Sequence, residues 1–346
     1  MSSSLILLAA FSAARAQSSD ATSALFSFGP TTSAPLQDTP EPSTIGYTPE
    51  DRKVIPYDAI PFQSDNATWG RGPQSGYNQC NSTTFGPDSQ CQTAVVNGLD
   101  DFCLWGLPDL SVVANEEAAA VAYCTNDTYG ARPIPAGSIY SAQMLYTPEY
   151  VQITGLLDQT KLNLMAGDYG GELDPVGADY RGNPLGGLMY SSIFSPDGSM
   201  QQIDHWTNFI GSDSFCLRIC QPGSYNATRN CDHIYDRIGC QYNMPHTVSN
   251  NTFEQCYADV GLPVGIYTDS AGNLETYTQP PESLGAITTI PYEPVTPSSS
   301  NCSSPTAPPA AFLLSPASAE SAVPVATDAP VSSVARRAVR WARNGL

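Results

Sequence analysis

The pattern of apolar and polar positions divides the chain into an apolar-rich centre and two poorer ends. Large apolar side chains are dense between residues 62 and 302, whereas residues 17–61 and 303–346 are rich in Ser, Thr, Pro or Ala. Segments with so few large apolar residues cannot bury enough surface to offset the entropy lost on ordering. We therefore expect one core domain over residues 62–302, a disordered Ser/Thr/Pro-rich arm over residues 17–61, and a disordered Ser/Pro/Ala-rich tail with a basic end over residues 303–346.

Within the core, short apolar runs broken by Pro, Gly and Asp predict strands. A strand or tight turn is expected at residues 99–105, and strands are expected in residues 138–164, 188–194 and 200–209. The stretches 265–268 and 274–278 are separated by the turn-forming residues 269–273, which predicts a β-hairpin.

Two segments favour helix. Residues 115–124 combine several alanines with Glu116 and Glu117 near the positive N-terminal end of the expected helix. In residues 231–240, Ile234 and Ile238 stand at helical spacing. Many strands with two short helices predict a mainly β, disulfide-stapled single domain, either a β-rich sandwich or an α+β fold.

The cysteines indicate a disulfide framework made in an oxidising compartment. There are ten, at Cys80, Cys91, Cys103, Cys124, Cys216, Cys220, Cys231, Cys240, Cys256 and Cys302. Structural zinc is disfavoured because Cys216-x-x-x-Cys220 lacks a second closely spaced pair. Spacing does not give the connectivity, and Cys231–Cys240 is the near-neighbour pair to test first.

The first sixteen residues predict a secretory signal peptide. An apolar run at residues 5–11 precedes Ala14-Arg15-Ala16, which has the small-x-small pattern of a cleavage site. No other segment approaches the roughly 18 apolar residues of a membrane span, so we expect no transmembrane segment and a secreted, extracellular or cell-wall location.

Six Asn-x-Ser/Thr sequons predict N-glycosylation of a secreted chain. They lie at Asn66, Asn81, Asn126, Asn226, Asn250 and Asn301. Ser and Thr beside Pro in the arm also favour O-glycosylation. The formal net charge of −19 makes binding to nucleic acid electrostatically unfavourable.

The glycine-rich stretch 167–188 holds the acids that could carry chemistry. Its carboxylates are Asp168, Glu172, Asp174 and Asp179. If the backbone is extended, Glu172 and Asp174 share one face with Cα atoms about 6.7 Å apart, near the lower limit of about 6.5 Å for the carboxyl pair of inverting glycosidases. All four acids together could instead bind calcium. The flanking glycines and Pro175 favour a turn, which would leave these acids as structural residues.

Other catalytic motifs are absent from the sequence. There is no G-x-S-x-G elbow, no H-E-x-x-H and no P-loop. The histidines, His205, His233 and His246, are expected to be surface or core residues. Trp69, Trp105 and Trp206 could stack on sugar rings, with core packing as the alternative for each.

Several motifs together resemble a known family. They are QCQTAVVNGLDDFCLWG (90–106), YVQITG (150–155), GDYGGELDP (167–175), RGNPLGG (181–187), DRIGC (236–240) and TQPPESLG (278–285). Over residues 80–302 the chain resembles the basidiomycete macrophage-activating glycoproteins, which are similar to the cryptococcal immunoreactive mannoproteins. The resemblance implies a mannosylated wall or extracellular antigen with a Ser/Thr-rich tail, sometimes GPI-anchored, and no catalytic residues. The C-terminus departs from that pattern, because its four arginines exclude a GPI signal.

These observations lead to one expectation and two alternatives. The expected protein is a secreted, N- and O-glycosylated fungal cell-wall or matrix glycoprotein without catalytic activity, with carbohydrate binding as a further role. The alternatives are a carbohydrate-active hydrolase using Glu172 and Asp174, and a calcium-binding extracellular module. The expected partners are cell-wall polysaccharide and, through the glycans, host lectins or immune receptors; calcium is the one cofactor considered.

Overall fold

The structure is a computed structural model that describes residues 54–304 and 310–312. The predicted signal peptide at residues 1–16 lies outside the described residues, as do most of the arm at 17–61 and most of the tail at 303–346. All described residues belong to one compact unit, Leu36–Leu346. No helix among them is long and apolar enough to cross a bilayer.

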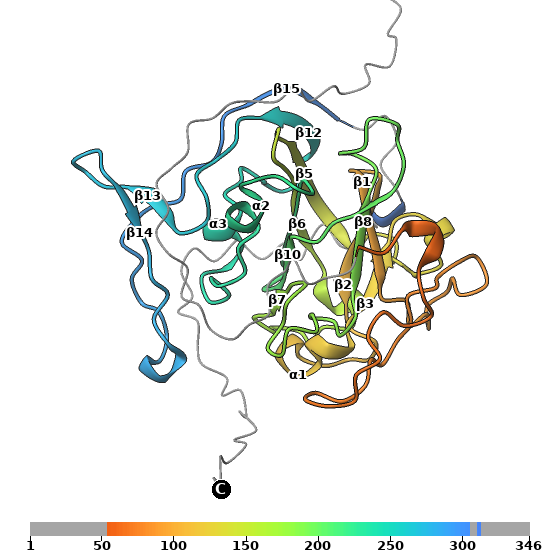
Figure 1. The fold of residues 1–346 in the computed structure, drawn as a ribbon. Helices are drawn as coiled ribbons and strands as arrows, with labels where there is room; N and C mark the ends of the chain where they lie inside the picture. Colours follow the sequence, from red (N-terminus) through yellow and green to blue (C-terminus); the bar gives the residue numbers. More distant parts are fainter. Residues whose placement is uncertain (1–53, 305–309, 313–346) are drawn as a thin grey trace, which may run out of the picture. The chain divides into compact units, whose positions relative to one another are not determined.

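Two larger β-sheets and one hairpin form the described part of the chain (Figure 1). The six-stranded sheet has the order β4-β3-β2-β1-β8-β9, with β1 Thr93–Gly98, β2 Asp101–Gly106, β3 Val121–Cys124, β4 Arg132–Pro133, β8 Leu188–Ser191 and β9 Gln201–Gln202. The seven-stranded sheet has the order β15-β12-β5-β6-β11-β10-β7, with β5 Ile139–Tyr146, β6 Tyr150–Leu157, β7 Gly171–Leu173, β10 Trp206–Gly211, β11 Ser214–Cys220, β12 Phe253–Ala258 and β15 Ser299–Ser303. The hairpin consists of β13 Ile266–Thr268 and β14 Leu274–Thr276.

Helices are few and short in the described residues. The α-helices are α1 Val113–Glu116, α2 Ala227–Asn230 and α3 Gly239–Asn243. Single 3-10 turns are η2 Tyr57–Ala59, η3 Glu117–Ala119, η4 Asp127–Tyr129, η5 Gln159–Leu162, η6 Glu282–Leu284 and η7 Ala310–Phe312. The predicted mainly β fold is therefore confirmed.

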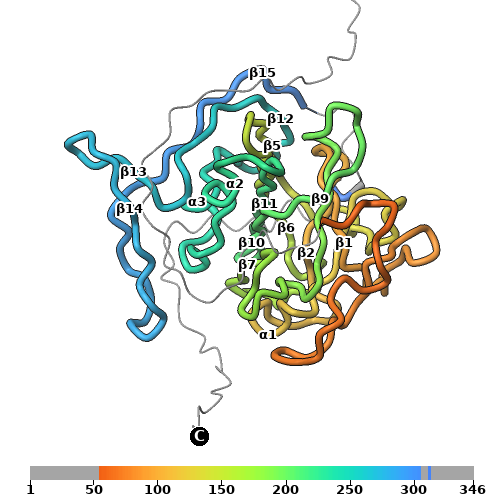
Figure 2. Tube along the Cα trace, in the orientation of Figure 1, coloured from red at the N-terminus to blue at the C-terminus, as the bar shows by residue number. Residues whose placement is uncertain are grey.

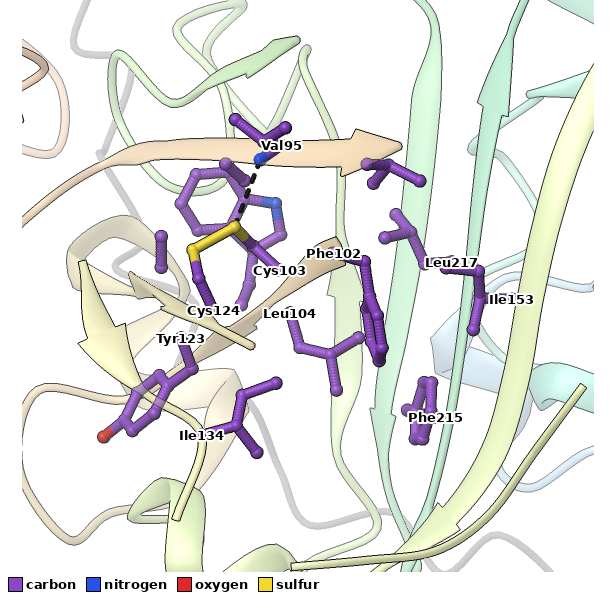
Figure 3. Packing of buried hydrophobic residues seen from close by; sticks show 14 of the residues in the cluster. Val95, Phe102, Cys103, Leu104, Tyr123, Cys124, Ile134, Ile153, Phe215 and Leu217 are labelled. Atoms are coloured by element: carbon purple, nitrogen blue, oxygen red, sulfur yellow. Dashed lines mark hydrogen bonds between the residues drawn. A yellow bond between two sulfur atoms is a disulfide. The ribbon is translucent and has the colours of Figure 1, made fainter. Parts of the chain in front are cut away.

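The core lies between the two larger sheets. Figure 3 shows Phe102 of β2 on the side of the sheet that faces Phe215 of β11, and the two ring centroids are 6.3 Å apart. Trp105 of β2 and Trp206 of β10 are fully buried with ring centroids 5.7 Å apart. Burial of such large apolar rings is the main favourable contribution to folding. Trp105 and Trp206 are thus core residues, which removes both from the candidates for sugar stacking.

Most of the strand predictions are confirmed. Residues 99–105 enter β2, residues 138–164 contain β5 and β6, and residues 188–194 contain β8. The hairpin forms as expected, with Thr268 paired to Leu274 across the loop 269–273. The run 200–209 is divided between β9 and β10, which belong to different sheets, because the chain crosses from one sheet to the other at residues 203–205.

The helix predicted at residues 115–124 is wrong beyond its first turn. The segment continues from α1 and η3 into β3, whose Cys124 pairs with Cys103 of β2 and is bonded to it. Residues 121–124 are all buried. Burial and sheet pairing outweigh alanine helix propensity, which amounts to less than about 1 kcal/mol per residue.

The helix predicted within residues 231–240 is also misplaced, because α2 ends before Cys231 and α3 begins at Gly239. The pairing Cys231–Cys240 is wrong for the same region. All ten cysteines are paired, as Cys80–Cys91, Cys103–Cys124, Cys216–Cys240, Cys220–Cys231 and Cys256–Cys302. Cys216 and Cys220 both lie on β11, so the two ends of segment 231–240 are fastened to one strand rather than to each other.

Residues from both flanks of the core pack against it. Figure 2 shows the first described residues, in red-orange, beside β1 and β9. The backbone N–H of Ile55 donates to Gln202 Oε1 at 2.6 Å, and the Tyr190 hydroxyl donates to the Ile55 carbonyl at 2.9 Å. At the other end the ring of Phe312 lies 5.0 Å from that of Phe253 and is buried.

Candidate functional site

The strand β7 directs Glu172 away from the core. β7 is the edge strand of the seven-stranded sheet, and Glu172 pairs with Phe209 of β10. Side chains alternate along a strand, and paired residues share a face. Leu173 belongs to the main core, whereas Phe209 packs with Met244, just after α3. Glu172 therefore lies on the outer face of the sheet, the face covered by the chain around α3.

A glycine allows β7 to approach its neighbour this closely. Gly170 has φ +82°, and a Cβ at this position would stand 1.8 Å from the carbonyl oxygen of Ile210. No other residue fits there without moving the backbone. The glycines before β7 thus serve the close approach of two strands, and the turn expected around Glu172 is a short strand instead.

Glu172 is buried with one carboxyl oxygen lacking a partner. The residue is 5% exposed. The Thr207 hydroxyl donates a hydrogen bond to Oε1 at 2.6 Å. Oε2 is buried and has no hydrogen-bond partner. Burial raises the pKa of Glu172 well above its usual range, and the charge of Asp174 raises it further, against the hydrogen bond from Thr207. The carboxyl group consequently stays protonated at pH values where ordinary glutamates are ionised.

Asp174 lies two residues beyond Glu172 and is also buried, but it receives backbone hydrogen bonds. Its Oδ1 accepts the backbone N–H groups of Val176 at 2.6 Å and Gly177 at 2.7 Å. The same oxygen is 3.9 Å from His233 Nδ1. The carboxyl group of Asp174 is thus held by hydrogen bonds from its own loop, whereas Glu172 receives one hydrogen bond, from Thr207.

Segment 231–240 brings the remaining groups to this face. Its two disulfides to β11 hold it over the sheet, so that His233 lies beside Asp174 and the charges of Asp232 and Asp236 act on Glu172. Asp236 also accepts a hydrogen bond from Gln279 Nε2. A groove of about 450 Å³, lined by residues 234–237 and 276–282, lies along this segment.

Several members of this site could not be recognised from the sequence. Thr207, His233, Asp232 and Asp236 become neighbours of Glu172 only through the β7–β10 pairing and the disulfides to β11. From the alternation of side chains along a strand, Thr207 is expected on the same face of β10 as Phe209. Placing segment 231–240 beside Glu172 requires the cysteine pairing, and the spacing of the cysteines does not reveal it.

The other two acids of the glycine-rich stretch have separate partners. Asp168 Oδ2 accepts the N–H of Val113 at 2.8 Å, and Asp179 Oδ1 is 2.5 Å from Arg71 Nη2. Burial acts to raise the pKa of Asp179, but the hydrogen bond and charge of Arg71 outweigh it and hold that pKa below its usual value. The four carboxylates therefore do not gather into one set of calcium ligands.

One group of side chains in the described ranges has its potential metal-ligand atoms close together. Only Glu254, Cys256 and Cys302 bring three potential ligand atoms within 4.8 Å of one another there, and both cysteines are oxidised in a disulfide. Disulfide sulfur has no thiolate to offer a metal, so this group is not a metal site.

Trp69 is the exposed tryptophan among the three proposed for sugar stacking, with 61% of its surface accessible. Its loop is fixed by Arg181, which donates to the carbonyl oxygens of Ala67, Trp69 and Gly72 at 2.6–3.0 Å. The Arg181 guanidinium lies 5.2 Å from the centroid of the Trp69 ring. One face of the indole is thus occupied by a cation in a fixed loop.

The sequon asparagines differ in exposure and in what their side-chain amides contact, and Asn126 Nδ2 donates to Asp101 Oδ1 at 3.4 Å. Asn66, Asn81, Asn250 and Asn301 are exposed, and Asn126 is half-buried. At Asn81 the Thr83 N–H and hydroxyl both donate to Oδ1, at 2.9 and 2.7 Å. Asn226 differs, because its Nδ2 donates to both carboxyl oxygens of Glu149 at 3.0 and 3.2 Å.

Comparison with known proteins gives two relatives. No family model and no solved structure matches the chain. Over 236 residues the chain is 44% identical to the appressorium protein ROW1 of Mycosarcoma maydis. The aligned residues make up 68% of this chain and 53% of ROW1. Over 208 residues the chain is 41% identical to the appressorium protein ROW2 of the same fungus, covering 59% of this chain and 71% of ROW2. The chain thus spans about half the length of ROW1 and over two thirds of ROW2.

Proposed function

The chain belongs to the family of the fungal appressorium proteins ROW1 and ROW2, and we propose that it is a secreted glycoprotein of the fungal cell surface that acts at the appressorium. The observation that carries the proposal is the complete pairing of all ten cysteines in the described core. Disulfides of this density form and persist in oxidising compartments.

The surface of the core supports N-glycosylation. Sequon asparagines are spread over several loops and the edge strand β15, and most are exposed. Glycans at these positions would project from the protein, where host lectins or immune receptors could bind them. A mannoprotein-like antigen anchored in or released from the wall fits this arrangement and the resemblance to the macrophage-activating glycoproteins.

Fractionation of a fungal culture expressing the full chain tests this proposal. We expect the protein in the medium or wall fraction, with a mobility shift after enzymatic removal of N-glycans and no cysteine reactive to a thiol label before reduction. Retention in the cell interior with reactive thiols would contradict the proposal, whatever the state of its glycans.

We further propose that Trp69 binds cell-wall polysaccharide. Its exposed indole is held in a fixed loop, so that little conformational entropy is lost when a sugar ring stacks on it. Binding of the deglycosylated protein to insoluble chitin and β-glucan is the measurement, with Trp69→Ala expected to lower the bound fraction severalfold.

Tyr225→Ala is the matched control for Trp69→Ala. Tyr225 is an exposed aromatic residue, 71% accessible, and its ring does not stack on an arginine among the described contacts. We expect this variant to bind as the wild type does. Equal binding by all three proteins, or background binding by the wild type, would rule out the Trp69 site without bearing on secretion.

A further inference from the structure

We propose that the N-glycan of Asn81 folds back onto the protein and packs its first N-acetylglucosamine units into an aromatic groove beside the sequon. The proposal rests on the N-glycosylation proposed above, and it involves neither Trp69 nor the buried acids around β7. It assigns a ligand to a part of the surface that the candidate site does not include.

The first observation is the groove itself. It has a volume of about 480 Å³ and is lined by residues 62, 77, 79 and 83–89. Three of the lining side chains are aromatic, and two of these are largely open to solvent, Phe62 at 60% and Phe85 at 41% exposure. Aromatic side chains gathered in one hollow are typical of a surface that another molecule covers.

The groove is held in shape by its own contacts. The rings of Phe62 and Tyr77 are stacked, with centroids 5.7 Å apart and planes inclined by 23°. In the loop 83–89, the hydroxyls of Thr84 and Ser89 both donate to the carbonyl oxygen of Gly130, at 2.8 and 2.9 Å. A surface fixed in this way loses little conformational entropy when a ligand binds.

The second observation is the position of the sequon at the rim of this groove. Asn81 is exposed and stands between Gln79 and Thr83, which both line the groove. The Thr83 hydroxyl donates to Asn81 Oδ1 at 2.7 Å, so the side-chain amide of Asn81 contacts a lining residue directly. An N-linked sugar is attached to the nitrogen of that same amide. The first sugar ring therefore begins at the edge of the groove.

The lining suits a neutral sugar. Asp88 is the one lining residue that carries a charge. Aromatic rings pack against the C–H face of a sugar ring and against the methyl group of an N-acetyl substituent. Gln79 Nε2 donates to the Ile60 carbonyl at 2.9 Å, which fixes this side chain, and its Oε1 and the exposed carboxylate of Asp88 can accept hydrogen bonds from sugar hydroxyl and N–H groups. N-acetylglucosamine, the sugar next to the asparagine, provides all of these groups and has no charge.

The covalent link to Asn81 decides between this sugar and a free polysaccharide. A tethered ligand is present at an effective concentration in the millimolar range for a short flexible link, so a weak contact is enough to keep it bound. A polysaccharide in solution gains no such advantage and would have to displace the attached sugar. The glycan of Asn81 is therefore the expected occupant of the groove.

The test measures how fast each glycan is released by an endoglycosidase that cuts between the two N-acetylglucosamine units of the core. The full chain is secreted from a fungal host, and peptide mass spectrometry gives the occupancy and the remaining glycan at each sequon. We expect release at Asn81 to be about 10-fold slower from the folded than from the denatured protein, the factor given by about 1.4 kcal/mol of binding free energy. Asn250 is the matched sequon, because it is exposed and lies outside the lining of the groove, and its glycan should be released much faster from the folded protein.

Removal of the aromatic rings should abolish the protection. We expect Phe62→Ala and Phe85→Ala each to raise the release rate at Asn81 severalfold, towards the rate at Asn250. Tyr225→Ala is the control, since it removes an exposed ring that does not line the groove and should leave release at Asn81 slow. Near-UV circular dichroism reports whether each variant keeps its fold.

Three results would overturn the proposal. The first is an occupied Asn81 whose glycan leaves the folded wild type as fast as the denatured protein, and the second is slow release that persists in folded Phe62→Ala and Phe85→Ala. The third is an empty Asn81 with glycans on other sequons, which would leave the secreted glycoprotein intact and remove only this contact.

A spectroscopic measurement on the wild type replaces the variants if these unfold. The ring currents of the aromatic groove must move the N-acetyl methyl signal of the Asn81 glycan upfield in the proton NMR spectrum. The shifted signal should be absent from Asn81→Gln and present in Asn250→Gln. A wild-type spectrum in which every N-acetyl methyl signal lies at its usual position contradicts the proposal.

Discussion

Glu172 is a carboxyl group that the fold buries without a cationic partner, and this has a consequence for stability. Because burial and Asp174 raise its pKa in the folded state, the folded protein binds this proton more tightly than the unfolded chain does. The stabilising contribution is complete below the unfolded pKa of about 4.3. It is lost as pH rises from there through the folded pKa, at about 1.4 kcal/mol for each pKa unit between them.

Glu172→Gln should therefore flatten the pH dependence of stability. We expect the unfolding free energy of the wild type to fall relative to that of the variant as pH rises from about 4 through the raised pKa of Glu172. Urea unfolding of both proteins at a series of pH values measures the difference. Asp179, whose lowered pKa works in the opposite direction, is present in both proteins and cancels. A constant difference across this range would show that Glu172 titrates normally.

The sequons are not equivalent at the residue scale. A glycan on Asn226 replaces one of the two Nδ2 hydrogens that Glu149 now binds, whereas Asn81 is exposed and uses only Oδ1 in the contacts with Thr83. We expect Asn226 to be the least occupied sequon of the core and Asn81 to be occupied. Peptide mass spectrometry after deglycosylation in heavy-oxygen water measures both. Full occupancy at Asn226 would show that Glu149 does not limit modification.

At the scale of elements, the edge strand β15 depends on its disulfide. All five of its residues are exposed, and Cys302 ties it to Cys256 of β12 across 46 residues of sequence. Closing so long a loop stabilises by about 4 kcal/mol in the chain-entropy estimate, against about 3 kcal/mol for a loop of a dozen residues such as that of Cys80–Cys91. The double change Cys256→Ser and Cys302→Ser should lower the unfolding free energy by about 2–4 kcal/mol.

Limited proteolysis of that variant distinguishes local loss of structure around β15 from unfolding of the whole core. We expect the first new cleavages between residues 285 and 303, while the two larger sheets stay resistant. The double change Cys80→Ser and Cys91→Ser serves as the control and should leave residues 285–303 as resistant as in the wild type. Simultaneous cleavage throughout the core of the first variant would mean that the bond holds the whole fold.

Local sequence patterns were sufficient to predict some elements of the fold but not others. The alternation and turn residues around Thr268 and Leu274 describe contacts between neighbours in sequence, and this hairpin was predictable. Residues 121–124 became a strand because β2 and a disulfide lie beside them, which no local propensity records. The sequence likewise indicated Glu172 and Asp174, but not the groups that segment 231–240 adds, since those depend on long-range cysteine pairing.

At the scale of the whole molecule, the described residues combine two packed sheets with a covering segment that two disulfides fasten to β11. The site arises where these parts meet: β7 supplies Glu172, β10 supplies Thr207 and the covering segment supplies His233. The disulfide framework that suits a secreted protein is thus also what brings the acidic groups together. Reduction of the protein should consequently abolish the unusual titration of Glu172 before the sheets unfold.

The most direct test of this arrangement is the titration of Glu172 itself. In full-length protein carrying carbon-13 at the glutamate carboxyl groups, the signal absent from Glu172→Gln identifies the residue. We expect this signal to titrate well above the pKa of about 4.3 of an ordinary glutamate, while the exposed Glu275 titrates in the usual range. If every glutamate titrates in that usual range, Glu172 is not a buried neutral acid.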